Sequence, residues 1–224
     1  MTAPRRSHPV PAALLLVLGA VTWVPARYGV MTTWDEPWLG LDYTAWNRGM
    51  LIPLLLFAGG AITAARTAAA RAAAVAWSAV ATGFSLSWVG VAVEFVLGGG
   101  LHGGPRDLAV GGWTIYLIGT AVTAVGALAL GAALVRRNSS IAVAAVVAGV
   151  AILAWPPLLA ASLDRLAVVD QLLVGLAWGV VGLHLRPPAG SGSAASRGTG
   201  MSGTARDSGS DRRDRSVGPF LDRP

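Results

Sequence analysis

The sequence of 224 residues contains no cysteine, which excludes disulfide bonds, thiolate nucleophiles and cysteine-ligated metal sites. It contains no lysine either, so all 17 basic residues are arginine. Charged residues make up only 12% of the chain, against about 25% in soluble domains. Together with a mean hydropathy of +0.60, this deficit indicates that lipid rather than water surrounds much of the chain.

The arginines give the chain a formal net charge of +6 and an isoelectric point near 11.2, values that also occur in nucleic-acid-binding proteins. Their positions argue against such a partner, because they stand at the ends of apolar runs and in the C-terminal segment rather than along one face. We therefore expect no nucleic-acid partner. His102 has no second ligand nearby at metal-binding spacing, so the sequence predicts neither a metal site nor a cofactor.

Six apolar runs are long enough to cross a bilayer as helices, since about 20 helical residues span its hydrocarbon core. The predicted spans cover residues 10–26, 49–65, 75–97, 111–135, 141–161 and 166–185. The sequence therefore predicts an all-α integral membrane bundle of six transmembrane helices over residues 10–186. The first run also has the shape of a signal peptide, but Pro25 at the candidate cleavage site and the spans that follow favour an uncleaved helix.

The segments outside the spans differ in composition. Residues 1–9 are short and basic, whereas residues 187–224 consist largely of glycine, serine, arginine and aspartate. A segment of the second kind cannot bury enough apolar surface to fold, so the sequence predicts a disordered C-terminal tail. Residues 27–48, between the first two spans, are predicted to form a loop.

The distribution of arginine predicts the orientation in the membrane. If the N-terminus is cytoplasmic, the cytoplasmic arginines before the tail are Arg5, Arg6, Arg66, Arg71, Arg136, Arg137 and Arg186. The outer arginines are then Arg27, Arg48, Arg106 and Arg165. Seven against four follows the positive-inside rule. We therefore expect a multi-pass protein of the cell (plasma) membrane whose N- and C-termini, residues 1–9 and 187–224, are both cytoplasmic.

Two acids lie inside predicted spans, Glu94 in the third and Asp170 in the sixth. A carboxylate there is costly and indicates a functional site. The topology places both roughly 6 Å inside the outer boundary, at 1.5 Å of rise per residue. At equal depth they suit a shared proton or cation, or an acid/base pair. The alternative is that each reaches the headgroups or pairs with a nearby arginine, such as Arg106 or Arg165.

The predicted loop 27–48 is rich in tryptophan and acids. Its candidate ligand-binding residues are Trp34, Trp38, Trp46, Asp35 and Glu36. Tryptophan concentrates where headgroups meet the apolar core, so one interpretation is a loop that lies along the membrane surface. The other is a lid of aromatic and acidic side chains over a cationic or sugar-like ligand.

Glycines within the spans predict close helix packing, because small residues let two helix backbones approach each other. Gly119, Gly126 and Gly131 lie in the fourth span, and Gly175 and Gly179 lie four residues apart in the sixth. Besides the lipid bilayer, the partner that this spacing allows is another membrane protein or a second copy of the chain, bound through Gly175 and Gly179.

The polar residues of the spans bear on the class of function. Apart from the two acids and Gln171, they are mainly serine and threonine, which is little for a substrate path. The sequence therefore favours a non-enzymatic membrane protein and leaves its biochemical activity open. The alternatives are a small proton-coupled transporter, or an intramembrane enzyme that uses Glu94 and Asp170 as an acid/base pair.

Overall fold

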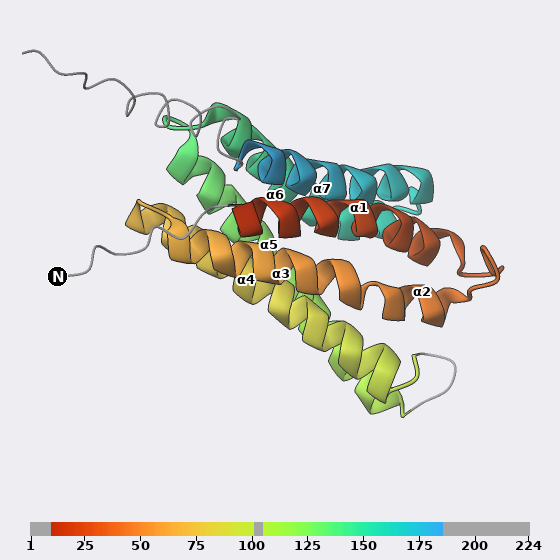
Figure 1. Cartoon of the computed structure of the whole chain (residues 1–224). Coiled ribbons are helices and arrows are strands. Elements are labelled where there is room, and N and C mark those ends of the chain that lie inside the picture. Colours follow the sequence, from red (N-terminus) through yellow and green to blue (C-terminus); the bar gives the residue numbers. More distant parts are fainter. Residues whose placement is uncertain (1–9, 101–104, 186–224) are drawn as a thin grey trace, which may run out of the picture. The chain divides into compact units, whose positions relative to one another are not determined.

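The computed structural model describes residues 10–100 and 105–185, to which every structural statement below refers. Helices make up 85% of these residues, and no strand occurs among them. In chain order the elements are α1 (Val10–Thr32), α2 (Tyr43–Gly49), α3 (Leu51–Thr67), α4 (Arg71–Val91), the π-helical segment η1 (Ala92–Leu97), α5 (Arg106–Leu134), α6 (Ser139–Ala160) and α7 (Asp164–His184) (Figure 1). The predicted N-terminal segment 1–9, the predicted tail 187–224 and His102 lie outside the described residues.

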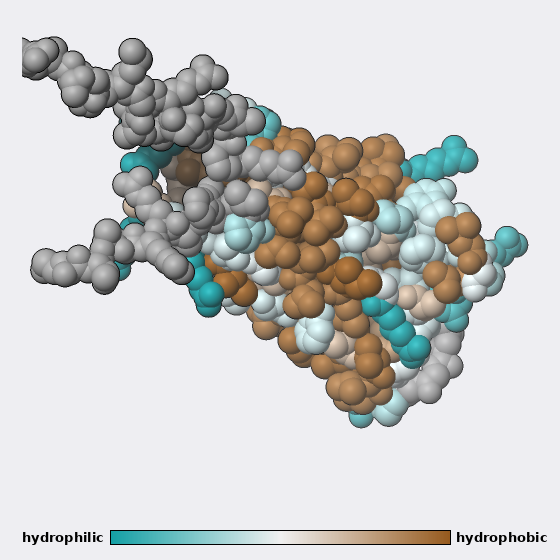
Figure 2. All heavy atoms as spheres, in the orientation of Figure 1, coloured by the Kyte–Doolittle hydropathy of each residue, from teal (hydrophilic) through white to brown (hydrophobic). Residues whose placement is uncertain are grey.

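Six helical stretches in the described part of the chain are long and apolar enough to cross a membrane; α2 joins α3, and η1 extends α4. The prediction of an all-α bundle of six transmembrane helices is confirmed, and the chain is a polytopic membrane protein. Figure 2 shows hydrophobic residues over the middle of the visible face and hydrophilic residues mainly toward its ends. Large apolar side chains such as Val21, Leu55 and Val125 are 60–65% exposed, as contact with lipid requires.

The loop predicted for residues 27–48 is much shorter in the structure. Helix α1 continues through Pro25 to Thr32, because a proline removes only one amide donor and its neighbours keep the helix together. The second membrane-crossing stretch already begins at Tyr43, where Asp42 caps α2 by accepting a 2.7 Å hydrogen bond from the Ala45 amide. Only residues 33–42 remain outside the helices.

The other helix ends follow from local chemistry as well. Asn138 caps α6 by accepting a 3.1 Å hydrogen bond from the Ile141 amide. Pro156 and Pro157 lie inside α6, which continues to Ala160. The prolines fall in the last turn and a half of that helix, where little of it remains to be interrupted.

The six membrane-crossing stretches form a closed ring in sequence order, hereafter the helix ring. Each packs mainly on its neighbours in the chain, and α7 closes the ring by packing on α1 (Figure 1). The pair with the most extensive contact is α4 with α5. Two turns of the chain, residues 68–70 and 135–138, lie at one end of the ring together with the start of α1. Residues 33–42, the α5 start and the turn before α7 lie at the other end, hereafter the cavity end.

Glycines make the closest helix contacts in the ring, as the sequence predicts. A Cβ atom on Gly119 would lie 2.5 Å from the Ser87 amide nitrogen, and one on Gly126 would lie 2.7 Å from the amide nitrogen of Val80. Gly112 meets Glu94 in the same way, so glycines along α5 let α4 and α5 pack backbone to backbone.

Gly175 and Gly179 make contact within the chain. A Cβ atom on Gly175 would lie 2.6 Å from the Trp23 ring, and one on Gly179 would lie 3.2 Å from Ala20 Cβ. Both glycines therefore seat α7 against α1, and their face is covered by the chain itself. Binding of a partner or a second copy stays a prediction; through these two glycines it would require that α1 move away from them.

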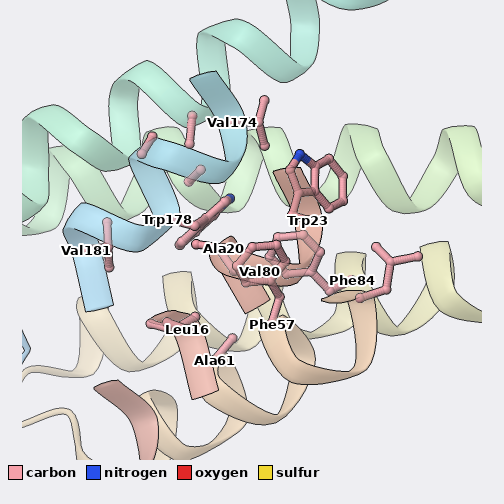
Figure 3. Packing of buried hydrophobic residues seen from close by; sticks show 14 of the residues in the cluster. Leu16, Ala20, Trp23, Phe57, Ala61, Val80, Phe84, Val174, Trp178 and Val181 are labelled. Atoms are coloured by element: carbon pink, nitrogen blue, oxygen red, sulfur yellow. The ribbon is translucent and has the colours of Figure 1, made fainter. Parts of the chain in front are cut away.

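Buried aromatic side chains fill the interior of the helix ring away from the cavity end. This aromatic plug consists of Phe57, Trp77, Phe84 and Trp178, each at most 3% exposed. Phe57 stacks on Phe84 with ring centroids 5.0 Å apart, and the Trp178 ring meets Phe84 edge-on at 5.5 Å (Figure 3). Burial of such large rings is a main source of stability in a core.

Candidate functional site

A cavity of about 650 Å³ occupies the interior of the helix ring at the cavity end. Its volume is in the range of small-molecule sites. The rings in its wall are Trp34, Tyr43, Phe95, Trp113, Tyr116 and Trp155. Its polar and charged residues are Arg27, Thr32, Asp35, Asn47, Glu94 and Asp164. An aromatic wall with a few converging polar groups is typical of a binding site for an organic ligand.

Arg27 lies in α1 on the wall of this cavity and is only 4% exposed. Its Nε donates a 3.0 Å hydrogen bond to Gln171 Oε1 on α7. The guanidinium carbon lies 4.5 Å from the ring centroid of Trp155, close enough for a cation–π interaction. Two neighbouring helices thus hold the guanidinium group in one place.

The guanidinium group of Arg27 is only partly used by the protein. Its Nη2 is buried and has no hydrogen-bond partner in the described part of the chain. A buried donor of a charged group without an acceptor costs free energy, so such a group usually has a partner that completes its bonding. A guanidinium group matches the paired oxygens of a carboxylate or phosphate. Because Arg27 lines the cavity, its incompletely bonded guanidinium group indicates a place for an anionic group there.

A short polar network supports Arg27 from the side away from the cavity. Gln171 Nε2 donates to Asp170 Oδ2 at 3.3 Å, which orients the Gln171 amide so that its oxygen faces Arg27. Trp23 Nε1 donates to the backbone oxygen of Gln171 at 2.8 Å. Asp170 is not among the residues that line the cavity; its contact with the site is the hydrogen bond to Gln171, which in turn holds Arg27.

Glu94 lies in the wall of the cavity and is 4% exposed. It belongs to the π-helical segment η1, a kind of helix irregularity that is frequent at functional sites. A Cβ atom on Gly112 would lie 2.6 Å from Glu94 Cβ, so α5 fixes the backbone that carries the acid. Within the described residues the carboxyl group has no hydrogen-bond or ion-pair partner.

The two acids predicted to form a pair do not share a site. The helices that carry them, α4 with η1 and α7, stand on opposite sides of the helix ring. Glu94 faces the cavity, whereas Asp170 lies behind Arg27 and Gln171. A substrate in the cavity would therefore meet only one of the two carboxyl groups directly.

The five candidates from the predicted loop fall into three groups. Trp34 and Asp35 line the cavity. Trp38 and Trp46 instead stack on each other with centroids 5.0 Å apart, and Trp46 Nε1 donates to the Trp38 oxygen at 3.3 Å. Glu36 is exposed and is not among the lining residues. Part of the segment thus borders the cavity, and part of it is packing that joins the segment to α2.

Arg27, one of the two buried charged residues of the site, is absent from the candidates drawn from the sequence. Because Arg27 follows an apolar run and Pro25, the sequence predicts that it is the first residue of an outer loop. One feature of the sequence does indicate that Arg27 belongs to the helix. Trp23, Arg27 and Val30 follow the helical spacing i, i+4, i+7, and all three are buried on one face of α1.

A scan against known protein families, a search of characterised proteins and a search of solved structures each found no match.

Proposed function

We propose that this membrane protein acts by binding a small ligand in the cavity, with an anionic group of the ligand held by Arg27. The observation that carries this proposal is a buried guanidinium group on a residue of the cavity wall, fixed by Gln171 and Trp155, whose Nη2 has no hydrogen-bond partner in the described part of the chain. Apolar walls exclude water there, which strengthens a charge-assisted hydrogen bond. The function we propose is binding; Tyr43 and Glu94, which also line the cavity, are among the titratable groups that a catalytic role would have to use.

Proton-coupled transport is the second candidate function. One observation favours it: Glu94, a buried carboxyl group without a partner, lies in an irregular helix segment on the cavity wall. Ligand uptake into liposomes driven by a pH gradient would support this candidate. The aromatic plug argues for binding alone, since it fills the other half of the ring and leaves the cavity with access from one end.

The arginine distribution supports a location in the cell membrane with the cavity end outside. Alkaline phosphatase fused after Arg106, at the cavity end, should be active. The same enzyme fused after Arg137, at the other end, should be silent. The opposite pattern would place the cavity on the cytoplasmic side and would make cytoplasmic compounds its ligands.

Ligand binding can be tested on the purified full chain in dodecyl maltoside. Lysophosphatidic acid offers a phosphate on one acyl chain, and the fluorescence of the tryptophans in the wall reports its binding. The dissociation constant should rise at least about tenfold in Arg27→Gln, since hydrogen bonds to charged groups contribute about 1.5–3 kcal/mol. Arg106→Gln removes an exposed charge at the same end and should bind as the wild type does.

A second variant protects this test against misfolding. Ala109 is 2% exposed and lines the cavity, so Ala109→Phe adds a ring to the wall while residue 27 stays arginine. It should also abolish binding while the protein stays folded. Binding that survives in both Arg27→Gln and Ala109→Phe would show that the ligand sits elsewhere.

A further inference from the structure

The charged residues of the cavity differ in how deeply they are buried. Arg27 is buried, and so is Glu94 in the same cavity. Asp35 and Asp164 also line the cavity, but both are exposed and stand at its mouth. One guanidinium group therefore faces three carboxyl groups. A ligand that carried only negative charge would be attracted by Arg27 and repelled at the mouth.

The two buried charges are held apart by the fold. An ion pair between Arg27 and Glu94 would satisfy both groups, yet the described part of the chain shows none between them: Arg27 is bonded to Gln171 with Asp170 behind it, and Glu94 has no bonded partner. The reason lies in the helix ring, where α3 stands between α1 and α4. Both groups are also fixed from behind, Arg27 by Gln171 and Glu94 by the backbone contact with Gly112.

We infer that the cavity takes a zwitterion, whose anionic group binds Arg27 and whose ammonium group binds Glu94 across the cavity. This inference rests on the proposed function and names the class of ligand. A zwitterion supplies the partner that each buried group lacks, so that neither charge stays desolvated and unpaired. The wall between them is aromatic, with Trp113 stacked on Tyr116 at 5.6 Å, and such rings attract ammonium groups.

The exposed acids at the mouth of the cavity also favour a ligand that carries a cationic group. Asp35 and Asp164 attract the cationic end of an approaching zwitterion and orient it before it enters. The same chemistry has two sources, the headgroup of an ethanolamine phospholipid and a water-soluble zwitterion. Residues with large exposed apolar surface, Trp34 and Val110 among them, border the cavity, so an attached acyl chain has a place to lie.

Three probes with matched parts test the inference in the full chain, with tryptophan fluorescence and the thermal midpoint as readouts. Lysophosphatidylethanolamine carries phosphate, ammonium and one acyl chain. Lysophosphatidic acid lacks the ammonium group, and glycerophosphoethanolamine lacks the acyl chain. The wild type should bind lysophosphatidylethanolamine about tenfold or more tightly than lysophosphatidic acid, the range expected for one charge-assisted hydrogen bond. Binding of glycerophosphoethanolamine would identify a soluble source, and its failure beside a binding lysolipid would identify a lipid.

Variants locate the preference in the cavity. Glu94→Gln should reduce the preference for the ethanolamine lipid to within about threefold and leave Arg27-dependent binding of lysophosphatidic acid in place. Glu36→Gln, an exposed acid outside the cavity wall, is the matched control and should keep the full preference.

Two results separate the inference from the proposed function. Equal or tighter binding of lysophosphatidic acid by the wild type, still lost in Arg27→Gln, would overturn the zwitterion and leave the anion site standing. Arg27-independent binding of every probe, or no binding at all, would overturn the anion site and the zwitterion with it.

Discussion

The two halves of the helix ring use the same six helices for different purposes. Away from the cavity end, Phe57, Phe84 and Trp178 meet in the interior and leave it filled. At the cavity end the interior is open, and its wall carries Arg27 and Glu94. Both halves are rich in aromatic residues, so composition does not distinguish them. The difference is that the rings of the plug contact one another, whereas the rings of the cavity surround space.

This difference divides stability from function. A filled interior gains dispersion energy from close packing, and a loss of volume there leaves a void. The open half gains less from packing and holds a buried cation with a free nitrogen, which costs stability without a ligand. Substitutions in the two halves should therefore have opposite consequences for the free energy of unfolding and for ligand binding.

The largest expected effect is the loss of a tryptophan from the plug. Trp178 is fully buried, and Trp178→Ala should lower the free energy of unfolding by about 3–5 kcal/mol. Unfolding by sodium dodecyl sulfate in mixed micelles measures this. Trp113 lies in the cavity wall and is 41% exposed, so Trp113→Ala should cost less than about 1 kcal/mol and weaken ligand binding instead. Equal losses of stability would abolish the distinction between the halves.

The reverse substitution, from small to large, sharpens the comparison. Ala61 is fully buried against the plug, so Ala61→Phe should cost about 3 kcal/mol by overpacking. Ala109→Phe adds the same ring on the cavity wall, where space exists, and should cost about 1 kcal/mol or less. The measurement is again unfolding in mixed micelles, paired with a binding titration. If Ala109→Phe proved as destabilising as Ala61→Phe, the cavity would not be open space.

The sequence predicts the fold well because the relevant signals are local. Apolar run length predicts the six membrane-crossing stretches, and glycine positions such as Gly119 and Gly126 predict close packing. The site is harder because it depends on which helices meet. Nothing local to Arg27 indicates that Gln171, 144 residues away, lies within 3.0 Å of it. The closure of the ring, which brings α7 to α1, is a property of the whole chain.

The pairing of Glu94 with Asp170 shows the same limit. Topology places both acids near the cavity end, where the helix of Glu94 ends and the helix of Asp170 begins. It does not predict their angular positions around the ring. Those positions follow from the packing order, which places α4 and α7 on opposite sides.

A smaller effect is expected from the residue that fixes Arg27. Gln171→Leu leaves Arg27 Nε without its acceptor and should cost about 1–3 kcal/mol of unfolding free energy. It should also loosen the guanidinium group and weaken anion binding, as titration would show. Asp170→Asn is the matched control, because an amide oxygen still accepts the bond from Gln171 Nε2. A Gln171→Leu protein as stable as the wild type would mean that water replaces the lost acceptor.

The smallest expected effect concerns the two acids as a pair. Sequence reasoning expects Glu94 and Asp170 to couple, whereas the structure separates them by Arg27 and Gln171. In a double-mutant cycle on unfolding with Glu94→Gln and Asp170→Asn, the effects should add to within about 0.5 kcal/mol, because the side chains share no direct partner. A larger deviation would show that the polar network transmits charge across the cavity. The same cycle with Gln171→Leu in place of Glu94→Gln should deviate more, since Asp170 and Gln171 are in contact.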